Sequence, residues 1–340
     1  MLSIGLRKQY CYFYLFLKNR NVTDPVIIYC CKGWSHLCYA IWSVRSLKRF
    51  NYKAIEVIVA NEVEKSFFVS HCPGVVCSVL DADSKDYPAF SYKPFVLQRY
   101  IKEIGIHYVD RDIVICDADI LWKNDPKLLF NRFENMNWVH KITAINPSDY
   151  ERNLNEVREA DIGLITLLNY KNKFDIEIYP NYRVNAGLFM LPEKSFGSVI
   201  NNWMDKIYSL SANEMKMSEA LLSLTYAEMN INPVCDEKDI KHYGVEIFSS
   251  SLNTSSFVVA NKDLKEDQYT GYETAQHYYG DQRRLMFKHA KEMGFDYDNL
   301  SRVANFDLIK KQLKSIPKIP KKVLSRVKRI LIRKKWKSKH

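Results

Sequence analysis

The pattern that most constrains the fold is the alternation of short apolar runs with amphipathic segments between residues 26 and 116. Four runs have the length and the Val and Ile content of buried strands: Val26–Cys31, Ile55–Ala60, Val75–Leu80 and Ile113–Cys116. Three segments between them carry apolar residues at helical spacing: His36–Phe50, Glu62–Val69 and Ser91–Ile104. Strands that alternate with helices are joined by right-handed crossovers and form a mainly parallel sheet. We therefore predict an α/β fold, a Rossmann-like and mainly parallel sheet with flanking helices.

The second half of the chain is less regular. The polar stretch Asn146–Asp161 predicts a mobile loop, and Asn185–Leu191 predicts a further strand. Two helices and two short strands are expected after it: Phe196–Leu210, Lys216–Met229, Val245–Ser249 and Phe257–Ala260. Near Ile309 Lys and Pro begin to dominate, so we expect an N-terminal segment over residues 1–25, one domain over 26–309 and a tail over 310–340.

The positive charge of the chain is confined to its end. The formal net charge is +11, from 50 Lys and Arg against 39 Asp and Glu. Residues 308–340 hold 14 of the basic residues and no acidic one, which leaves 36 basic and 39 acidic residues before them, a net charge of −3. A globular domain that binds nucleic acid carries its basic face on the fold itself. We therefore expect no nucleic acid among the partners.

The eight cysteines do not have the pattern of a disulfide framework, which is typical of short secreted chains. Cys30, Cys31 and Cys116 lie inside apolar runs, where a free thiol packs as a small apolar group. Cys72 and Cys77 have no second pair of ligands at the spacing of a zinc site. We expect reduced thiols and a cytoplasmic protein.

The chemistry of the chain is concentrated where the run Ile113–Cys116 ends in Asp117-Ala118-Asp119. In open α/β sheets ligands bind at the carboxyl ends of the strands, and two residues that are two apart point to one side. Two carboxylates that converge repel each other unless a cation or a shared proton compensates. Hard divalent ions such as Mn²⁺ and Mg²⁺ bridge such carboxylates to substrate phosphates. An Asp-rich turn that caps the next element is the structural alternative.

The stretch "ICDADILWKNDP" (Ile115–Pro126) resembles the metal-binding segment of glycosyltransferases of the GT-A fold, and most of all the retaining galactosyl- and glucosyltransferases of family eight. Five further segments resemble pieces of that family in the same order: "SVRSL" (Ser43–Leu47), "KPFVLQRYI" (Lys93–Ile101), "VNAGLFML" (Val184–Leu191), "MSEALLSL" (Met217–Leu224) and "HYYGDQRR" (His277–Arg284). The chain departs from the family at Cys30-Cys31-Lys32, where an acidic residue is usual, and at Arg283-Arg284, near which Lys-Pro is usual. The stereochemistry of transfer is therefore left open.

The resemblance implies a metal-dependent hexosyltransferase that takes its sugar from a nucleotide diphosphate donor, with a UDP-sugar expected. Asp117, Asp119 and His277 would hold Mn²⁺ or Mg²⁺ on the donor, and Asp117 could also reach the ribose. Three basic side chains would bind the phosphates: Lys93, Arg283 and Arg284. Asn185 and Gly187 would lie beside the sugar, and Glu219 would act on it. The expected acceptor is a cell-surface glycan or a lipid-linked glycan.

Purely structural roles stay open for several of these residues. His277 could be a structural histidine among aromatic residues, and the arginine pair a solvated basic face. Glu219 could be a surface residue of a helix. At the level of function, the alternative is a metal-dependent nucleotidyltransferase or phosphohydrolase that uses the same Asp pair. Nucleotidyltransferases often carry a Gly-rich phosphate loop near the first strand, whereas Gly33 stands alone here.

The basic tail contains an amphipathic segment, Val323–Trp336, with apolar residues on one helical face and Lys and Arg around them. Such a segment suits an anionic membrane surface, where each basic residue contributes about 1 kcal/mol. A solvated or nucleic-acid-binding tail is the alternative reading. We expect a peripheral protein at the inner face of the cell membrane.

Overall fold

The computed structural model describes residues 24–82, 87, 91–103, 111–122, 125–140, 142–157, 161–174, 177–235, 286, 288, 290–304 and 306. Several sequence-based expectations fall outside these residues. They are the two strands expected near 245 and 257, the basic tail, and three candidate site residues, His277, Arg283 and Arg284.

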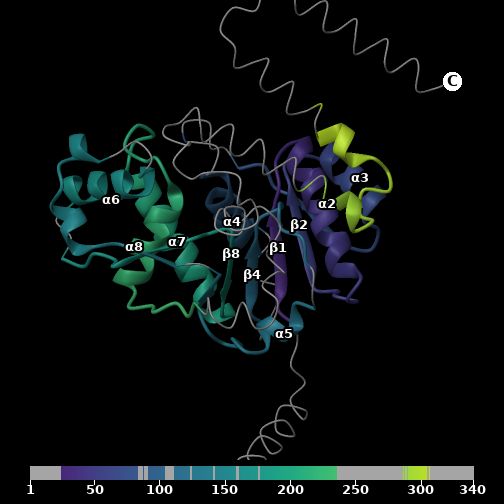
Figure 1. Ribbon diagram of the computed structural model, residues 1–340, viewed down its shortest axis with the longest axis horizontal. Helices are drawn as coiled ribbons and strands as arrows, with labels where there is room; N and C mark the ends of the chain where they lie inside the picture. Colours follow the sequence, from purple (N-terminus) through teal and green to yellow (C-terminus); the bar gives the residue numbers. More distant parts are fainter. Residues whose placement is uncertain are drawn as a thin grey trace, which may run out of the picture.

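A six-stranded sheet forms the centre of the molecule (Figure 1), in the order β3-β2-β1-β4-β8-β5. Its strands are β1 (Val26–Cys30), β2 (Ile55–Val59), β3 (Val76–Val79), β4 (Ile113–Cys116), β5 (Trp138–Val139) and β8 (Leu188–Leu191). The first four strands are parallel, and β8 is antiparallel to both β4 and β5. The mainly parallel sheet predicted from the alternating pattern is confirmed. A separate two-stranded sheet pairs β6 (Ile142–Ala144) with β7 (Tyr182–Val184).

Helices cover both faces of the central sheet. The helices are α2 (Trp34–Lys48), α3 (Glu62–His71), α4 (Tyr92–Glu103), α5 (Lys127–Phe130), α6 (Ile162–Lys173), α7 (Glu193–Ser209) and α8 (Ser218–Glu228). Val26 and Ile28 of β1 point to the core shared with α4, α6, α7 and α8. Ile27 and Tyr29 point to the other core, which is closed by α2, α3, α5 and the C-terminal segment, residues 290–304. The alternation along β1 therefore separates two cores, as expected for a strand buried on both sides.

Asn185–Leu191 is not one strand, which corrects the expectation. β7 ends at Val184 and β8 begins at Leu188, and the three residues between them turn from the small sheet into the large one. The N–H of Ala186 donates to the Glu219 carboxylate and that of Gly187 to the Asn185 side chain. Because side chains take these two N–H groups, neither joins a strand ladder.

The polar stretch expected to be a loop over Asn146–Asp161 contains two short 3₁₀ helices, Pro147–Glu151 and Leu154–Glu156. Helix α6 follows it and has no counterpart among the expected elements. Asp161 begins this helix as its N-cap, since its carboxylate accepts the N–H of Leu164 at 3.1 Å. Asp161 is a favourable N-cap residue and could have indicated the start of a helix. However, a Gly and several β-branched residues weaken the helical pattern of the sequence that follows.

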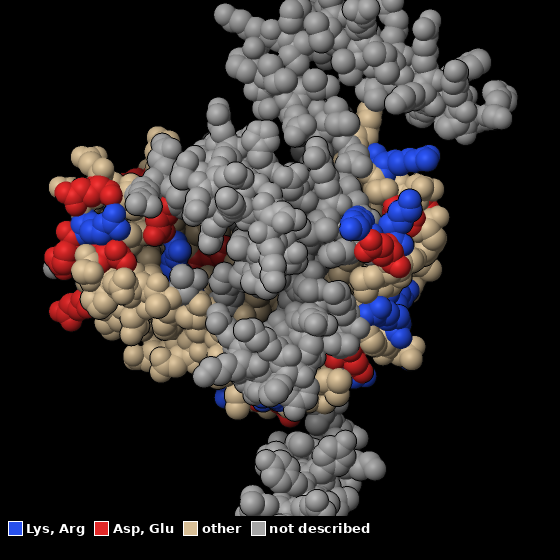
Figure 2. Space-filling model, viewed as in Figure 1, with Lys and Arg blue, Asp and Glu red and all other residues tan. Residues whose placement is uncertain are grey.

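The described surface carries both signs of charge. On the face drawn in Figure 2, the described Lys and Arg side chains lie beside Asp and Glu, and acidic side chains gather near α6. Among the helices in the described part of the chain, none is long and apolar enough to span a membrane. All seven described cysteines are free thiols.

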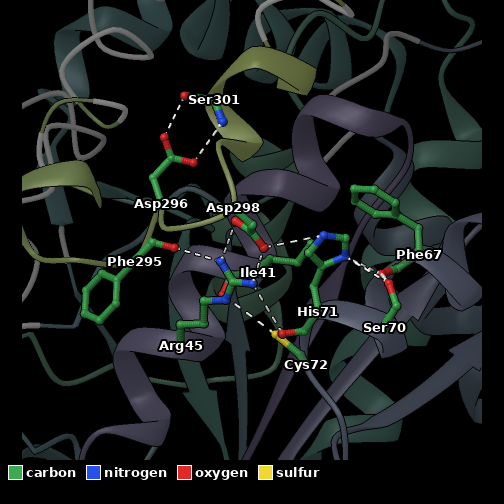
Figure 3. A network of polar contacts seen from close by, with 10 residues as sticks. All are labelled: Ile41, Arg45, Phe67, Ser70, His71, Cys72, Phe295, Asp296, Asp298 and Ser301. Atoms are coloured by element: carbon green, nitrogen blue, oxygen red, sulfur yellow. Dashed lines mark hydrogen bonds and ion pairs between the residues drawn. The ribbon is translucent and has the colours of Figure 1, made fainter. Parts of the chain in front are cut away.

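The C-terminal segment is fixed to α2 by the side chain of Arg45 (Figure 3). The Arg45 guanidinium donates to both Asp298 carboxylate oxygens, at 3.0 and 2.6 Å, and to the Phe295 carbonyl at 2.7 Å. It also lies over the Tyr297 ring, 4.0 Å from the centroid. His71 of α3 lies 3.4 Å from the same carboxylate. These contacts join residues about 250 positions apart to the helix that follows the first strand.

Loss of this ion pair should loosen the C-terminal segment. We expect Asp298→Ala to lower the free energy of unfolding by about 3 kcal/mol, because it leaves the buried Arg45 guanidinium without its carboxylate. Urea unfolding measures this, with Glu292→Ala as the matched control, since its pair with Lys288 is exposed. Equal stability of the Asp298 variant and the wild type would contradict the expectation.

The same pair predicts a pH dependence. Burial would raise the pKa of Asp298, but the hydrogen bond and charge of Arg45 outweigh it and lower that pKa below the ordinary 3.8. A lowered folded-state pKa adds stability above the unfolded value. The Asp298 contribution should therefore be complete above pH 3.8 and be lost as the pH falls further. The difference between wild type and Asp298→Ala should shrink in that acid range.

Candidate functional site

The two aspartates lie where β4 leaves the sheet. Asp117 follows Cys116 directly, and Ala118 and Asp119 form a turn. The N–H of Asp117 donates to the Gly187 carbonyl at 2.7 Å, which continues the antiparallel pairing of β4 with β8 for one more residue. Both aspartates are half-buried. The sheet therefore sets the position of Asp117 through its main chain and leaves the carboxylate at the carboxyl edge, where the sequence predicted it.

Lys93 brings a positive charge to this edge. It lies in the first turn of α4, and its ammonium group pairs with the Asp117 carboxylate and donates to the Ala186 carbonyl at 2.5 Å. Its side chain is only 16% exposed, against 42% for Asp117. Burial would lower the pKa of Lys93, but Asp117 outweighs this by its charge and hydrogen bond, so the pKa is raised. Lys93 is therefore a fixed cation at neutral pH.

The turn Asn185–Gly187 packs tightly against Asp117. The Asn185 side-chain oxygen accepts the N–H of Gly187 at 2.8 Å. A Cβ atom added at Gly187 would lie 2.7 Å from that oxygen and 3.0 Å from Asp117 Oδ2. Glycine is needed here because any side chain would displace one of the two polar groups.

Glu219 reaches the same turn from the first turn of α8. Its carboxylate accepts the N–H of Ala186 at 3.2 Å. Burial raises the pKa of Glu219, the hydrogen bond from Ala186 and the charges of Lys93 and Arg183 oppose the rise, and the charge of Asp117 adds to it. Since Ala186 bonds Lys93 through its carbonyl and Glu219 through its N–H, one residue separates the cation from this carboxylate.

The structure thus brings together five of the residues singled out in the sequence: Lys93, Asp117, Asn185, Gly187 and Glu219. Asp119 lies two residues beyond Asp117 in the same turn. The other three candidates, near residue 280, lie outside the described residues. What these side chains do chemically stays a prediction.

Two further residues join the site that sequence reasoning did not single out. His140 is buried behind Gly187, with its Cε1 atom 3.6 Å from the position of a Cβ there, and its Nδ1 donates to the Leu188 carbonyl at 2.8 Å. Arg183 pairs with Asp161 at 2.5 Å and its charge acts on Glu219. Arg183 could have been predicted from the sequence, since it lies two residues before the candidate Asn185. No candidate residue lies next to His140 in the sequence.

The chemistry of the donor set fits a divalent ion in part. Asp117 and Asp119 are hard oxygen donors two residues apart in one turn, and among the described residues the two aspartates and Glu219 outnumber the positive charge of Lys93. The described residues hold no group of three or more His, Cys, Asp or Glu side chains arranged to bind a metal ion. Mg²⁺ commonly uses one or two carboxylates and completes its shell with water and substrate phosphates. Asp117 and Asp119 are therefore the residues that would hold such an ion.

No protein-family model matches the chain, and no curated protein matches it in sequence. Among solved structures, the galactosyltransferase LgtC in complex with donor and acceptor sugar analogs is similar with a TM-score of 0.37 and 14% identity, over 58% of this chain and 70% of LgtC. The apo form of the glycosyltransferase GlyE of Streptococcus pneumoniae TIGR4 is similar with a TM-score of 0.40 and 11% identity, over 85% of this chain and 64% of GlyE. Both are glycosyltransferases, the class that the sequence motifs resemble.

Substitution of Gly187 tests the close packing of the turn. We expect Gly187→Ala to lower the free energy of unfolding by about 1–3 kcal/mol, because the new methyl group overlaps Asn185 and Asp117. The control is Gly197→Ala in α7, where a Cβ meets nothing within 4 Å and where Ala should stabilise the helix by about 0.5–1 kcal/mol. Urea unfolding compares the two variants, and a stabilised Gly187→Ala would show that the turn is looser than described.

Glu219 should stabilise the fold less than a neutral glutamine does. Because its folded-state pKa lies above the ordinary 4.5, stability falls as the pH rises from 4.5 through the folded-state pKa. Glu219→Gln keeps an acceptor for the Ala186 N–H, so we expect it to equal or exceed wild-type stability at pH 7. Glu228→Gln, also on α8, is the control and should destabilise, since it removes the ion pair of the buried Lys206. Thermal unfolding across pH 4–8 measures both, and marked loss of stability in Glu219→Gln would contradict the raised pKa.

Proposed function

We propose that this protein is a glycosyltransferase that moves a hexose from a nucleotide-diphosphate sugar, with a UDP-sugar expected, to a glycan or lipid-linked acceptor. The observation that carries the proposal is the double use of Ala186. Its carbonyl accepts from the Lys93 ammonium, which pairs with Asp117, and its N–H donates to Glu219. A buried ammonium group and a carboxylate with a raised pKa therefore contact the same residue at one sheet edge.

This arrangement would supply the two functions that sugar transfer needs. Lys93 would donate to the diphosphate as negative charge grows on it, since ammonium–phosphate hydrogen bonds are strong. When bound by Asp117 and Asp119, Mn²⁺ or Mg²⁺ would offset the same charge as a Lewis acid. Asn185 and Gly187 would border the sugar between the phosphate end and Glu219, where the absence of a side chain at Gly187 allows close approach.

Glu219 would act at the reacting carbon or at the acceptor. Its raised pKa brings it closer to neutral pH, where a general base is most effective. As a carboxylate it would either stabilise positive charge on the sugar or accept the proton of the acceptor hydroxyl. The first role belongs to a retaining transfer and the second to an inverting one.

The contacts of Glu64 disfavour the alternative nucleotidyltransferase. Such enzymes bind phosphates at main-chain N–H groups between the first strand and its helix. Here the Glu64 carboxylate accepts the N–H of Gly33, the N-cap of α2, at 3.0 Å and the N–H of Ala60 at 3.1 Å. A carboxylate in this place repels a phosphate, so we favour the edge beside Asp117 as the phosphate site.

The proposed location is the inner face of the cell membrane, reached through the basic residues of 310–340. It rests on the amphipathic pattern of the tail in the sequence, together with its excess of positive charge.

Calorimetry with UDP-, GDP- and CDP-sugars, with and without Mn²⁺, tests the proposed function. We expect one nucleotide sugar to bind the full-length protein only with the metal ion, and Asp119→Ala to abolish both this binding and transfer. Asp205→Ala on the exposed side of α7 is the control and should bind as the wild type does. Full transfer by Asp119→Ala in EDTA would contradict the proposed metal dependence.

A further inference from the structure

The turn with the two aspartates is anchored at its far end by Trp122, whose side chain is fully buried. The Trp122 main-chain N–H donates to the Ser46 hydroxyl at 2.9 Å, and its carbonyl accepts from the Arg49 guanidinium at 2.7 Å. Its indole N–H donates to the Tyr29 hydroxyl at 3.2 Å. All three polar groups of this residue are thus held by β1, by α2 and by Arg49, the C-cap of α2.

Helix α2 therefore supports the turn from the side opposite to the candidate site. Asp117 is fixed at one end by the Gly187 carbonyl, and Trp122 at the other by Ser46 and Arg49. Ser46 is itself oriented, because its hydroxyl donates to the Ser43 carbonyl at 2.5 Å. The four residues between Asp117 and Trp122, Asp119 among them, span two fixed points.

Arg49 differs from the other supports in being exposed. Its guanidinium lies over the rings of Phe50, at 4.5 Å, and Phe295, at 5.7 Å. The carbonyl of the same Phe295 accepts from Arg45, one turn earlier on α2 (Figure 3). The C-terminal segment thus contacts both arginines: Arg49, which holds the turn, and Arg45, which holds the C-terminal segment.

We propose that Arg49 is a positioning residue of the donor site, which holds the Asp117–Asp119 turn through the Trp122 carbonyl. The C-terminal segment braces Arg49 in this place through Phe295. This role rests on the proposed function, because the turn is taken to bind the donor. In this role Arg49 acts through the turn and is not a catalytic residue. Small displacements of a binding group have large effects on a reaction, about a hundredfold for 1 Å.

A matched control lies next to Arg49 in the sequence. Lys48 is also an exposed cation near the end of α2 and donates to a loop carbonyl at the same distance, 2.7 Å, but to Pro73. Both residues therefore donate a charged hydrogen bond from the end of α2 to a loop carbonyl. Only the bond of Arg49 leads to the acidic turn.

The experiment compares Arg49→Met, Arg49→Lys and Lys48→Met in the full-length protein. The first measurement is main-chain hydrogen exchange, which needs no ligand. We expect Arg49→Met to speed exchange at residues 118–122, Arg49→Lys to restore part of the protection, and Lys48→Met to leave this turn unchanged. Wild-type exchange at the turn in Arg49→Met would overturn the proposal, whatever the protein binds.

The second measurement is calorimetry with Mn²⁺ and UDP. We expect Arg49→Met to weaken binding about tenfold or more, with Arg49→Lys intermediate and Lys48→Met like the wild type. Equal weakening in Arg49→Met and Lys48→Met would overturn the role of Arg49, because a general loss of stability would explain both. If the wild type binds no nucleotide at all, the proposed function fails and the donor-site role fails with it, while the exchange data still report whether Arg49 holds the turn.

Discussion

The antiparallel pairing of β8 with β4 is the interaction on which the candidate site depends. It places the Gly187 carbonyl opposite the N–H of Asp117 and so delivers the Asn185–Gly187 turn to the carboxyl end of a parallel strand. A fifth parallel strand would begin at the opposite edge and bring its first residues away from the aspartates. The reversal of one strand therefore assembles main-chain polar groups and carboxylates that lie about 70 residues apart in the sequence.

The carboxylates of the site can lie close together only if their negative charge is compensated. Burying a carboxylate costs free energy unless a cation or hydrogen bonds offset the loss of water. Lys93 offsets Asp117 directly, whereas Glu219 has only the Ala186 N–H in hydrogen-bond contact among its described partners. The two carboxylates consequently differ: Asp117 pairs with a buried ammonium group, whereas burial raises the pKa of Glu219.

Sequence patterns predicted the features that depend on residues close together in the chain. The four parallel strands and the Asp117–Asp119 turn follow from apolar runs and the residues that end them, and both lie where they were expected. The break between Val184 and Leu188 was not foreseen, because it arises from hydrogen bonds to Asn185 and to Glu219, the latter on α8. His140 was missed because its place behind Gly187 depends on the pairing of β5 with β8. No residue near His140 in the sequence predicts this pairing.

The charges at the turn also constrain what binds there. Among the described residues, Lys93 supplies one positive charge, Asp117, Asp119 and Glu219 supply up to three negative ones, and the charge of nearby Arg183 is matched by Asp161. A diphosphate brought to this edge would add further negative charge in a half-buried place, where repulsion is screened weakly. Protonation of Glu219 removes only one of these charges. The described side chains do not offset this added charge, and under the proposed function a divalent cation held by Asp117 and Asp119 would do so.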